Sequence, residues 1–324
     1  MTLKAVLIFV APLVIGVAAL FVGAYGLAPS DVIAALPGGR SAAAASVVRD
    51  VRLPRGILAG LGGASLAGSG ATLQAVFRNP LVDPFLLGIS SGAALGCAIG
   101  VGFLPFLPVP LLAFLFGLGA VALTWGLGRG VGGDDRLSMV LAGVVVSALF
   151  TALVSLVKVM VDPLRLQSIV FWLMGSFSLA NWRHVAIAGT GAAIGLVPMI
   201  LFRWRLNMLS LGDEEAAGLG IDVRRMRFLF VAATTLAAAT AVSVSGVVGW
   251  IGLMVPHLVR MATGPDHCRS LPLSIAGGAA FMIAADTLAR SLVSWEVPVG
   301  IVTALAGAPF FAMIMRRGRS RWAP

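Results

Sequence analysis

The sequence predicts an all-α membrane protein with about ten transmembrane helices in one subunit. Hydrophobic residues make up 59% of the 324 residues and charged residues only 11%, whereas soluble domains contain roughly 45–50% and about 25% respectively. A chain of this composition cannot cover its surface with water-facing side chains. Apolar runs as long as a membrane span, about 20 residues, recur along the whole chain. We therefore expect residues 1–324 to form a single transmembrane domain.

Clusters of charged residues, proline or glycine separate the expected spans. The spans cover residues 5–27, 56–77, 85–103, 109–128, 137–160, 184–202, 228–250, 271–292 and 297–315, and a shorter run at 251–263 adds a partial crossing. The first run follows Lys4 and is longer than the apolar core of a secretory signal, so we interpret it as the first span. An even number of crossings places both termini on the same side of the membrane.

The basic residues orient this arrangement. The net charge is +10, from 23 basic and 13 acidic residues, and we interpret the excess as a loop-orienting charge rather than as a nucleic-acid surface. With both termini in the cytoplasm, most basic residues fall in cytoplasmic loops, as the positive-inside rule expects. The only lysines are Lys4 and Lys158, and neither follows a glycine, which excludes a Gly-Lys-Ser/Thr phosphate loop. If ATP drives this protein, another chain must bind it.

The longest inward loop, residues 203–227, contains the signals of a helix. Ser210 precedes Asp213 by three residues, which resembles a capping box, and the acids at 213–215 fall in a first turn, where the helix dipole favours them. Gly218 and Gly220 can end the helix. We expect one short helix that projects from the membrane. It is either a docking knob for a cytoplasmic partner or a solvated helix without one.

Four blocks of sequence follow one another along the chain. They are RLPR at 52–55 with RNPL at 78–81, LGDE at 211–214, GWIGLMVPH at 249–257, and a last block with Asp286, Arg290, EVPVG at 296–300 and GAPF at 307–310. In this order they resemble the FecCD family of ABC import permeases, and the resemblance covers nearly the whole chain. Trp250 stands where the family more often has Phe, which predicts a change of packing only.

The resemblance implies a type II ABC importer permease fold and a set of partners. These are a second permease copy or a homologous permease, two cytoplasmic ABC ATPase subunits, and a periplasmic or lipoprotein substrate-binding protein. The cargoes of the family are ferric siderophores, haem, cobalamin and related chelates, and the membrane is the bacterial inner membrane. ATP and Mg²⁺ would be bound by the partner ATPase. In this chain we expect no catalytic residue, no metal ligand and no cofactor.

The resemblance also assigns two sets of contact residues. The coupling helices, which sit in a groove of the ATPase, correspond to Leu211, Gly212, Asp213, Glu214, Ala217, Gly218, Leu219 and Gly220. On the outward face, Arg52, Arg55 and Arg290 are candidates for docking the binding protein, since the guanidinium fork binds carboxylates through two hydrogen bonds. The competing interpretation is local pairing: Asp286 and Arg290 are four residues apart on one helix face, and Asp50 lies near the other two arginines.

Candidate gate and pathway residues have two interpretations as well. Asn79, Pro80, Asp83 and Pro84 break the chain after the second span, where an unwound loop can line a gate, or where Asn79 and Asp83 simply cap helices. Met160, Trp172 and Met174, with Phe171 and Phe177, form either the apolar wall of a path for a bulky planar cargo or anchors and gap fillers. His257 has no ligand partner at metal spacing, so we expect it to make structural hydrogen bonds.

Two other classes of function remain as alternatives. A stand-alone secondary transporter usually places ionisable groups near the bilayer midplane, whereas nearly all charges here map to the ends of spans. A membrane-embedded enzyme needs paired carboxylates, a histidine cluster or a nucleophile with its base at that depth, and no such group is apparent. The leading hypothesis is therefore the permease of an ATP-driven importer.

Overall fold

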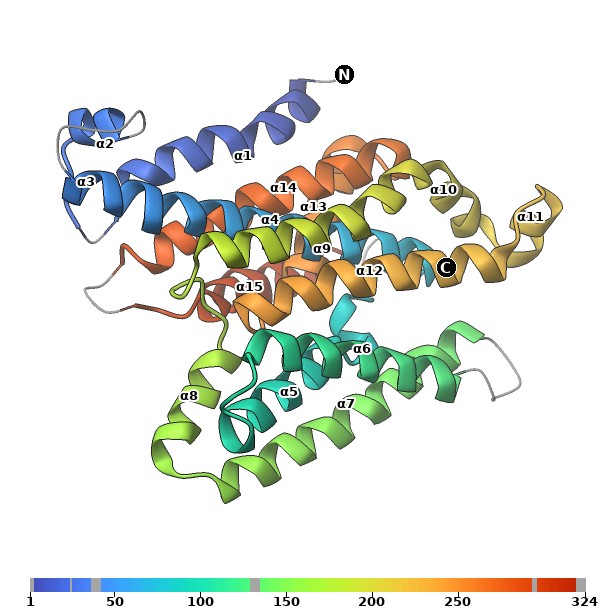
Figure 1. Cartoon of the computed structure of the whole chain (residues 1–324). Coiled ribbons are helices and arrows are strands. Elements are labelled where there is room, and N and C mark those ends of the chain that lie inside the picture. The colour runs from blue at the N-terminus through green and yellow to red at the C-terminus, as the bar shows by residue number, and fades with distance from the viewer. Residues whose placement is uncertain (1–2, 24, 36–41, 129–134, 293–295, 319–324) are drawn as a thin grey trace.

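The computed structural model describes residues 3–23, 25–35, 42–128, 135–292 and 296–318, and within these ranges the chain is helical and contains no strand (Figure 1). The helices are α1 (Leu3–Phe21), α2 (Pro29–Ala35), α3 (Ala42–Ser46), α4 (Leu53–Val76), α5 (Ile89–Phe103), α6 (Val109–Gly128), α7 (Asp135–Met160), α8 (Pro163–Leu173), α9 (Trp182–Leu201), α10 (Arg203–Leu211), α11 (Asp213–Gly218), α12 (Val223–Ser245), α13 (Ile251–Thr263), α14 (His267–Ala289) and α15 (Val299–Gly318). A π-helical turn, η1 (Val47–Arg52), leads into α4, and a 3₁₀ turn, η2 (Pro84–Leu87), precedes α5.

Seven helical segments in the described part of the chain are long and apolar enough to cross a membrane. They are Leu3–Phe21, Ala43–Val76, Val109–Gly128, Leu137–Met160, Trp182–Leu201, Val223–Ser245 and His267–Ala289. Three shorter apolar helices, Ile89–Phe103, Ile251–Thr263 and Val299–Ile314, accompany them. The predicted fold class, an all-α membrane protein, is confirmed. The prediction of about ten transmembrane helices corresponds to these seven long segments and three shorter apolar helices.

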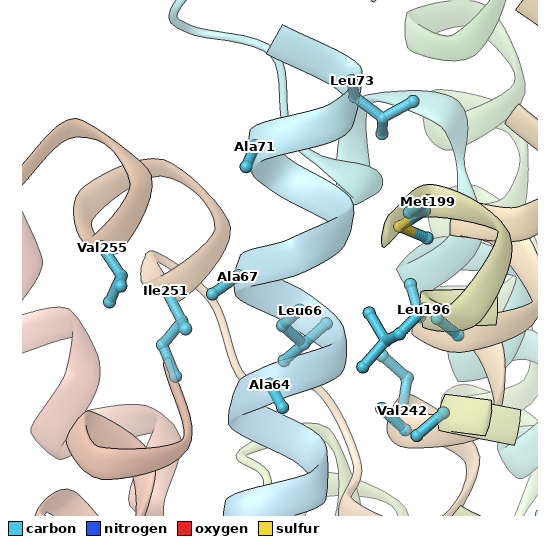
Figure 2. Close-up of a cluster of buried hydrophobic side chains, with 14 of the residues drawn as sticks. Ala64, Leu66, Ala67, Ala71, Leu73, Leu196, Met199, Val242, Ile251 and Val255 are labelled. Carbon is cyan, nitrogen blue, oxygen red and sulfur yellow. The ribbon is translucent and has the colours of Figure 1, made fainter. Parts of the chain in front are cut away.

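Helix α4 lies at the centre of the bundle. Of its most apolar window, 83% is buried inside the protein, against 11% for α1 at the edge. It packs against α9, α12, α13 and α14. Figure 2 shows Leu66 of α4 near Leu196 of α9 and Val242 of α12, with Ile251 of α13 on the other side of the helix. Its small residues let four helices approach one axis, as expected where lipid supplies no hydrophobic force between helices.

Glycine makes the closest of these approaches possible. A Cβ added at Gly63 of α4 would lie 2.1 Å from the carbonyl oxygen of Gly278 in α14, and one at Gly278 would lie 2.3 Å from the carbonyl oxygen of Gly63. The two backbones therefore touch directly. This reciprocal contact fixes α14 against α4. It also holds the start of α4 close to the end of α14, where charged residues of both helices meet.

Helices α5 to α8 form a second group below α12 (Figure 1). Within it, α5 packs against α6, α7 and α8, and α12 joins the group to the rest of the bundle through contacts with α5 and α6. Helix α8 was not predicted as a separate element. It has 11 residues, too few to span, and it begins where Asp162 accepts hydrogen bonds from the amides of Leu164 and Arg165, both 3.1 Å.

Other boundaries also differ from the prediction. The connection between the first two predicted spans, 5–27 and 56–77, contains α2, α3 and η1. Helix α12 begins at Val223 rather than 228, because the Asp222 side chain caps it by accepting from the Arg225 amide at 3.0 Å. The basic run at 224–227 is therefore the first turn of α12, and Gly246, at φ +70, ends the helix.

Candidate functional site

Helices α10 and α11 connect α9 to α12, and α11 projects at one end of the bundle, at the right-hand edge of Figure 1. Asp213, Glu214 and Glu215 occupy its first turn, where the helix dipole stabilises negative charge. After α11, Gly220 at φ +82 turns the chain toward α12. The predicted acidic helix is present, although the loop holds two helices rather than one. We call this the α11 end of the bundle.

The predicted capping box at Ser210 is wrong. Ser210 lies in the last turn of α10, where its hydroxyl donates to the carbonyl oxygen of Asn207 at 2.7 Å. The residue that precedes α11 is Gly212, which has an extended backbone (φ 163) and no side chain with which to cap. Because α10 continues to Leu211, Ser210 cannot adopt the non-helical backbone that a capping residue requires.

An ion pair ties α11 to α12. Arg227 Nη2 lies 2.7 Å from Asp213 Oδ2, and the Arg227 side chain is 8% exposed whereas that of Asp213 is 44% exposed. Ala216 is fully buried beneath the helix. The short helix is therefore held from its first residue and from its underside.

The other face of α11 is open. Most residues predicted for coupling are exposed, namely Leu211, Glu214, Ala217, Gly218, Leu219 and Gly220; Asp213 is half-buried and Gly212 is buried. Two large apolar side chains, Leu211 and Leu219, flank the acidic turn on this open face. The surface combines negative charge with apolar contacts on a rigid support, which is a suitable composition for docking a protein.

Helix α10 is attached to the start of α14. Asn207 Nδ2 donates to Asp266 Oδ1 at 2.7 Å, and Asn207 Oδ1 accepts from the His267 amide at 2.8 Å. The bond from Asn207, followed by one from the Cys268 amide, holds the pKa of the Asp266 carboxyl below its ordinary value. A weaker bond of 3.4 Å runs from Arg78 Nη1 to the Leu211 carbonyl oxygen. The connection from α9 to α12 is thus braced against the start of α14 and the turn after α4.

The loop after α4 contains the predicted gate residues. Asn79 Oδ1 accepts from the Leu81 amide at 2.9 Å, and Asp83 Oδ1 accepts from the amides of Phe85 at 3.0 Å and Leu86 at 3.2 Å. Pro84 is the first residue of η2 and Pro80 lies in the turn before it. Asp83 is therefore a cap, as one of the two interpretations predicted, and Asn79 closes a local turn. A role in gating stays a prediction.

A hydrogen-bonded chain stabilises the same end of α4. Gln74 Nε2 donates to the Gly252 carbonyl oxygen at 2.9 Å, and Gln74 Oε1 accepts from Arg260 Nη2 at 2.5 Å. A Cβ at Gly70 would lie 2.0 Å from the same Gly252 carbonyl oxygen. Helix α13 is thus joined to α4 at its first and last turns, next to the Asn79–Asp83 loop.

The three arginines predicted for docking lie together at the opposite end of the bundle. Arg55 holds Asp286 in a two-bond contact, Nε to Oδ2 at 2.9 Å and Nη2 to Oδ1 at 2.8 Å, and its Nη2 lies 2.5 Å from Glu296 Oε1. Arg290 Nε lies 3.9 Å from Asp286 Oδ2. The local pairing of Asp286 with Arg290 is therefore present, although Asp286 makes its shorter contacts with Arg55.

Arg52 and Arg290 also hold the end of α1. Arg52 donates to the carbonyl oxygens of Leu20, at 2.6 Å, and of Tyr25, and Arg290 donates to the carbonyl oxygen of Ala19 at 2.5 Å. These cations satisfy carbonyls that a helix C-terminus leaves without partners. The three guanidinium groups thus have partners within this chain, and docking of a binding protein stays a prediction.

The predicted pathway residues surround the ends of α7 and α8. Met160, the last residue of α7, is exposed. Met174 lines an open cavity of about 420 Å³ together with Trp250 and Leu305, whereas Trp172 lines a different cavity of about 680 Å³. The structure therefore does not bring these three side chains to a single cavity. His257, expected to form hydrogen bonds, instead packs edge-on against the Phe310 ring at 6.3 Å.

Comparison with known proteins identifies the family. Residues 10–317 match the FecCD transport family. The chain belongs to this family. Its curated relatives include a protein of Helicobacter pylori (strain ATCC 700392 / 26695), described as an iron chelatin transport system permease, which is 45% identical over 84% of this chain and 83% of the relative. The molybdate import permease MolB of Haemophilus influenzae is 40% identical over 83% of this chain and 80% of the relative.

A solved transporter structure agrees with the fold. It is described as a metal-chelate type ABC transporter in an inward-facing conformation, is 36% identical, and superposes with a TM-score of 0.88 over 97% of this chain and 99% of the other. The chain is therefore a multi-pass membrane permease of the ABC importer class, as the sequence predicted.

Sequence reasoning assigned no role to two residues of this FecCD permease. Arg227 is the partner of Asp213, and Gln74 joins α4 to α13. An arginine near the start of an apolar helix, where the dipole disfavours a cation, is the sequence signal that could have indicated a nearby carboxylate.

Proposed function

We propose that this FecCD permease imports a metal chelate into the cytoplasm, powered by two ABC ATPase subunits that bind α11. An extracytoplasmic binding protein delivers the cargo, and the permease works as a pair with a second copy or a homologous chain. The observation that carries the proposal is α11 itself, an exposed acidic helix fixed from beneath by Arg227 and Ala216. The α11 end then faces the cytoplasm of a bacterial inner membrane.

The geometry of α11 suits the transmission of force. A helix that must pass on a rigid-body movement of its partner needs an exposed contact face and a firm attachment. Leu211 and Leu219 supply exposed apolar contacts, and the acidic turn between them supplies charge. ATP and its Mg²⁺ are bound by the partner ATPase, so α11 acts as a lever and takes no part in the chemistry.

Docking at the opposite end is supported by charge. Arg52, Arg55 and Arg290 carry three positive charges, whereas their described carboxylate partners, Asp286 and Glu296, carry two. The side chain of Glu296 is the more exposed of the two carboxylates. We propose that a carboxylate of the binding protein joins this cluster and takes up the unbalanced positive charge.

The class of cargo is proposed from the relatives. Besides iron chelatin and molybdate permeases, they include proteins described as hemin and cobalamin import permeases. Met174 and Trp250 give the cavity of about 420 Å³ a mostly apolar lining, which suits a large chelate better than a small hydrated oxyanion. A metal chelate is therefore proposed ahead of molybdate.

Reconstitution tests this function directly. Proteoliposomes that contain the permease, its ATPase and its binding protein are supplied with ATP and, in separate samples, with a ferric siderophore, haem, cobalamin or molybdate. We expect ATP-dependent uptake of one of the chelates. Uptake of molybdate alone would refute the cargo class, and uptake by the permease alone under an ion gradient would refute the ATP-driven mechanism.

A further inference from the structure

A long crevice lies between α6 and α9. Its lining includes Trp172, a predicted pathway residue, but no residue of α11 and none of the arginines proposed for docking. Helix α12 packs against both α6 and α9 and forms the floor. Two cavities of about 710 and 680 Å³ occupy the crevice, and both are lined by Pro110, His184 and Ser243. Because they share these residues, the two cavities lie side by side along the crevice.

The crevice has the length of one membrane leaflet. On α9 its lining extends from Asn181, the capping residue, to Ile194, which corresponds to about 20 Å of helix at ~1.5 Å per residue. Half of the hydrocarbon core is about 15 Å thick. The crevice therefore runs from the bilayer surface, at the end opposite α11, to about the midplane.

The inner part of the crevice is lined by apolar side chains. They are Leu111, Phe114, Ile187, Ile194 and Leu236. The hydroxyl groups between them are already satisfied: Thr190 donates to the Ala186 carbonyl at 2.9 Å, Thr240 to Leu236 at 2.7 Å and Ser243 to Thr240 at 2.8 Å. The lining therefore offers few free donors to a polar cargo. A hydrocarbon chain, which needs none, fits it.

The mouth of the crevice is cationic. Arg183 lines it and is exposed, and among the described residues no carboxylate is paired with this guanidinium. Trp182 beside it is exposed at the start of α9, the position that tryptophan prefers at a membrane surface. A phosphate is the anion that a membrane supplies at this depth, and arginine binds phosphate through two parallel hydrogen bonds.

We propose that the crevice between α6 and α9 is a binding site for one anionic phospholipid, with its phosphate on Arg183 and an acyl chain against α12. The walls support this occupant. Helices α6 and α9 are both candidate spans, and only 39% and 28% of their most apolar windows are buried inside the protein. Their remaining faces are not covered by other helices of this chain, which leaves a route for lipid into the crevice from the side.

Native mass spectrometry of the purified permease tests the site. The protein is extracted in mild detergent, and its retained phosphatidylglycerol is compared with retained phosphatidylcholine after equal exposure to both. Ala186→Trp fills the crevice with a ring, and the matched control is Ala193→Trp, an exposed alanine on the same helix that does not line the crevice. Arg183→Gln removes the charge at the mouth and leaves the apolar slot.

The wild-type protein should retain one phosphatidylglycerol. Ala186→Trp should lower the retained lipid about tenfold, whereas Ala193→Trp should leave it unchanged. Arg183→Gln should lower the preference for phosphatidylglycerol about fivefold, the effect of one basic residue at an anionic surface. Equal retention by both tryptophan variants, or an unchanged preference in Arg183→Gln, would each overturn the proposal. None of these measurements depends on transport, so their failure is distinct from failure of the importer function.

Discussion

The ion pair between Asp213 and Arg227 gives the sharpest test of how α11 is held. Asp213→Asn removes the charge but keeps a residue of nearly the same shape at the first position of α11. Arg227 then remains in its buried position without this carboxylate. We expect α11 to detach more often from α12 while the rest of the bundle stays folded.

The magnitude follows from the exposure of the two side chains. Exposed pairs contribute about 0–1 kcal/mol, and removing one partner of a buried pair costs about 3–5 kcal/mol. Asp213 is 44% exposed and Arg227 is 8% exposed, so Asp213→Asn should cost about 2 kcal/mol. Arg227→Gln should cost less, about 1 kcal/mol, because the Asp213 carboxylate that remains can be hydrated.

Hydrogen exchange measures this local stability. The amides of Ala216 and Leu219 donate within α11, at 3.0 and 3.1 Å, and report its opening. A cost of about 2 kcal/mol predicts exchange about 30-fold faster in Asp213→Asn, and about 1 kcal/mol predicts roughly fivefold in Arg227→Gln. In proteoliposomes, ATP hydrolysis by the complex should continue while the cargo transported per ATP falls.

The neighbouring pair of Arg225 with Asp222 provides a matched control. Its atoms are 2.9 Å apart, but the arginine side chain is 85% exposed and the pair lies within one helix. Arg225→Gln should therefore leave α11 exchange and coupling unchanged. The reasoning would be refuted if Arg225→Gln and Arg227→Gln had equal effects, or if Asp213→Asn left the α11 amides as protected as before.

Three further predictions concern the scaffold. Gly63→Val should abolish the monodisperse folded protein in detergent gel filtration, because its Cβ would meet the Gly278 carbonyl oxygen at 2.1 Å, whereas Gly119→Val, with no atom within 4 Å, should not. Asp83→Ala should lower thermal stability by about 1 kcal/mol through loss of a cap, and Asp83→Asn should restore most of it. The pKa of Asp266 is lowered in the folded protein, so its contacts stabilise the α10 attachment at neutral pH. This stabilisation is lost as the pH falls below about 4 and through the lowered pKa, because the carboxyl is then protonated. Exchange of α10 amides should rise in that range, and less so in Asp266→Asn.

The sequence predicts the spans well because their composition is a property of each segment alone. Lipid requires about 20 apolar residues in each full crossing, so α6, whose predicted range of 109–128 agrees with Val109–Gly128, can be recognised without knowing its neighbours. Short helices are different. Helix α8 depends on its cap at Asp162 and on packing against α5. Because it is too short to span a membrane, its sequence alone does not distinguish it from a loop between two spans.

The pairings within the site could not be predicted, because they join residues far apart in sequence. Arg55 and Asp286 meet only because Gly63 and Gly278 bring α4 and α14 into backbone contact. From the sequence, these arginines could either dock a binding protein or pair within the chain. Two of them bind carbonyl oxygens at the end of α1, and the sequence does not reveal where that end lies. The capping box at Ser210 failed for the opposite reason: the local motif is present, but α10 extends through it.

Braces on both sides of α11 determine how the proposed lever can move. Asp213 joins α11 to α12, and Asn207 joins α10 to the start of α14 through Asp266. Helices α12 and α14 both pack against α4, and the Asn79–Asp83 loop follows α4 directly. If an ATPase displaces α11, we expect the displacement to pass through these contacts to α12 and α14, and through the bond from Arg78 to Leu211 to the loop after α4.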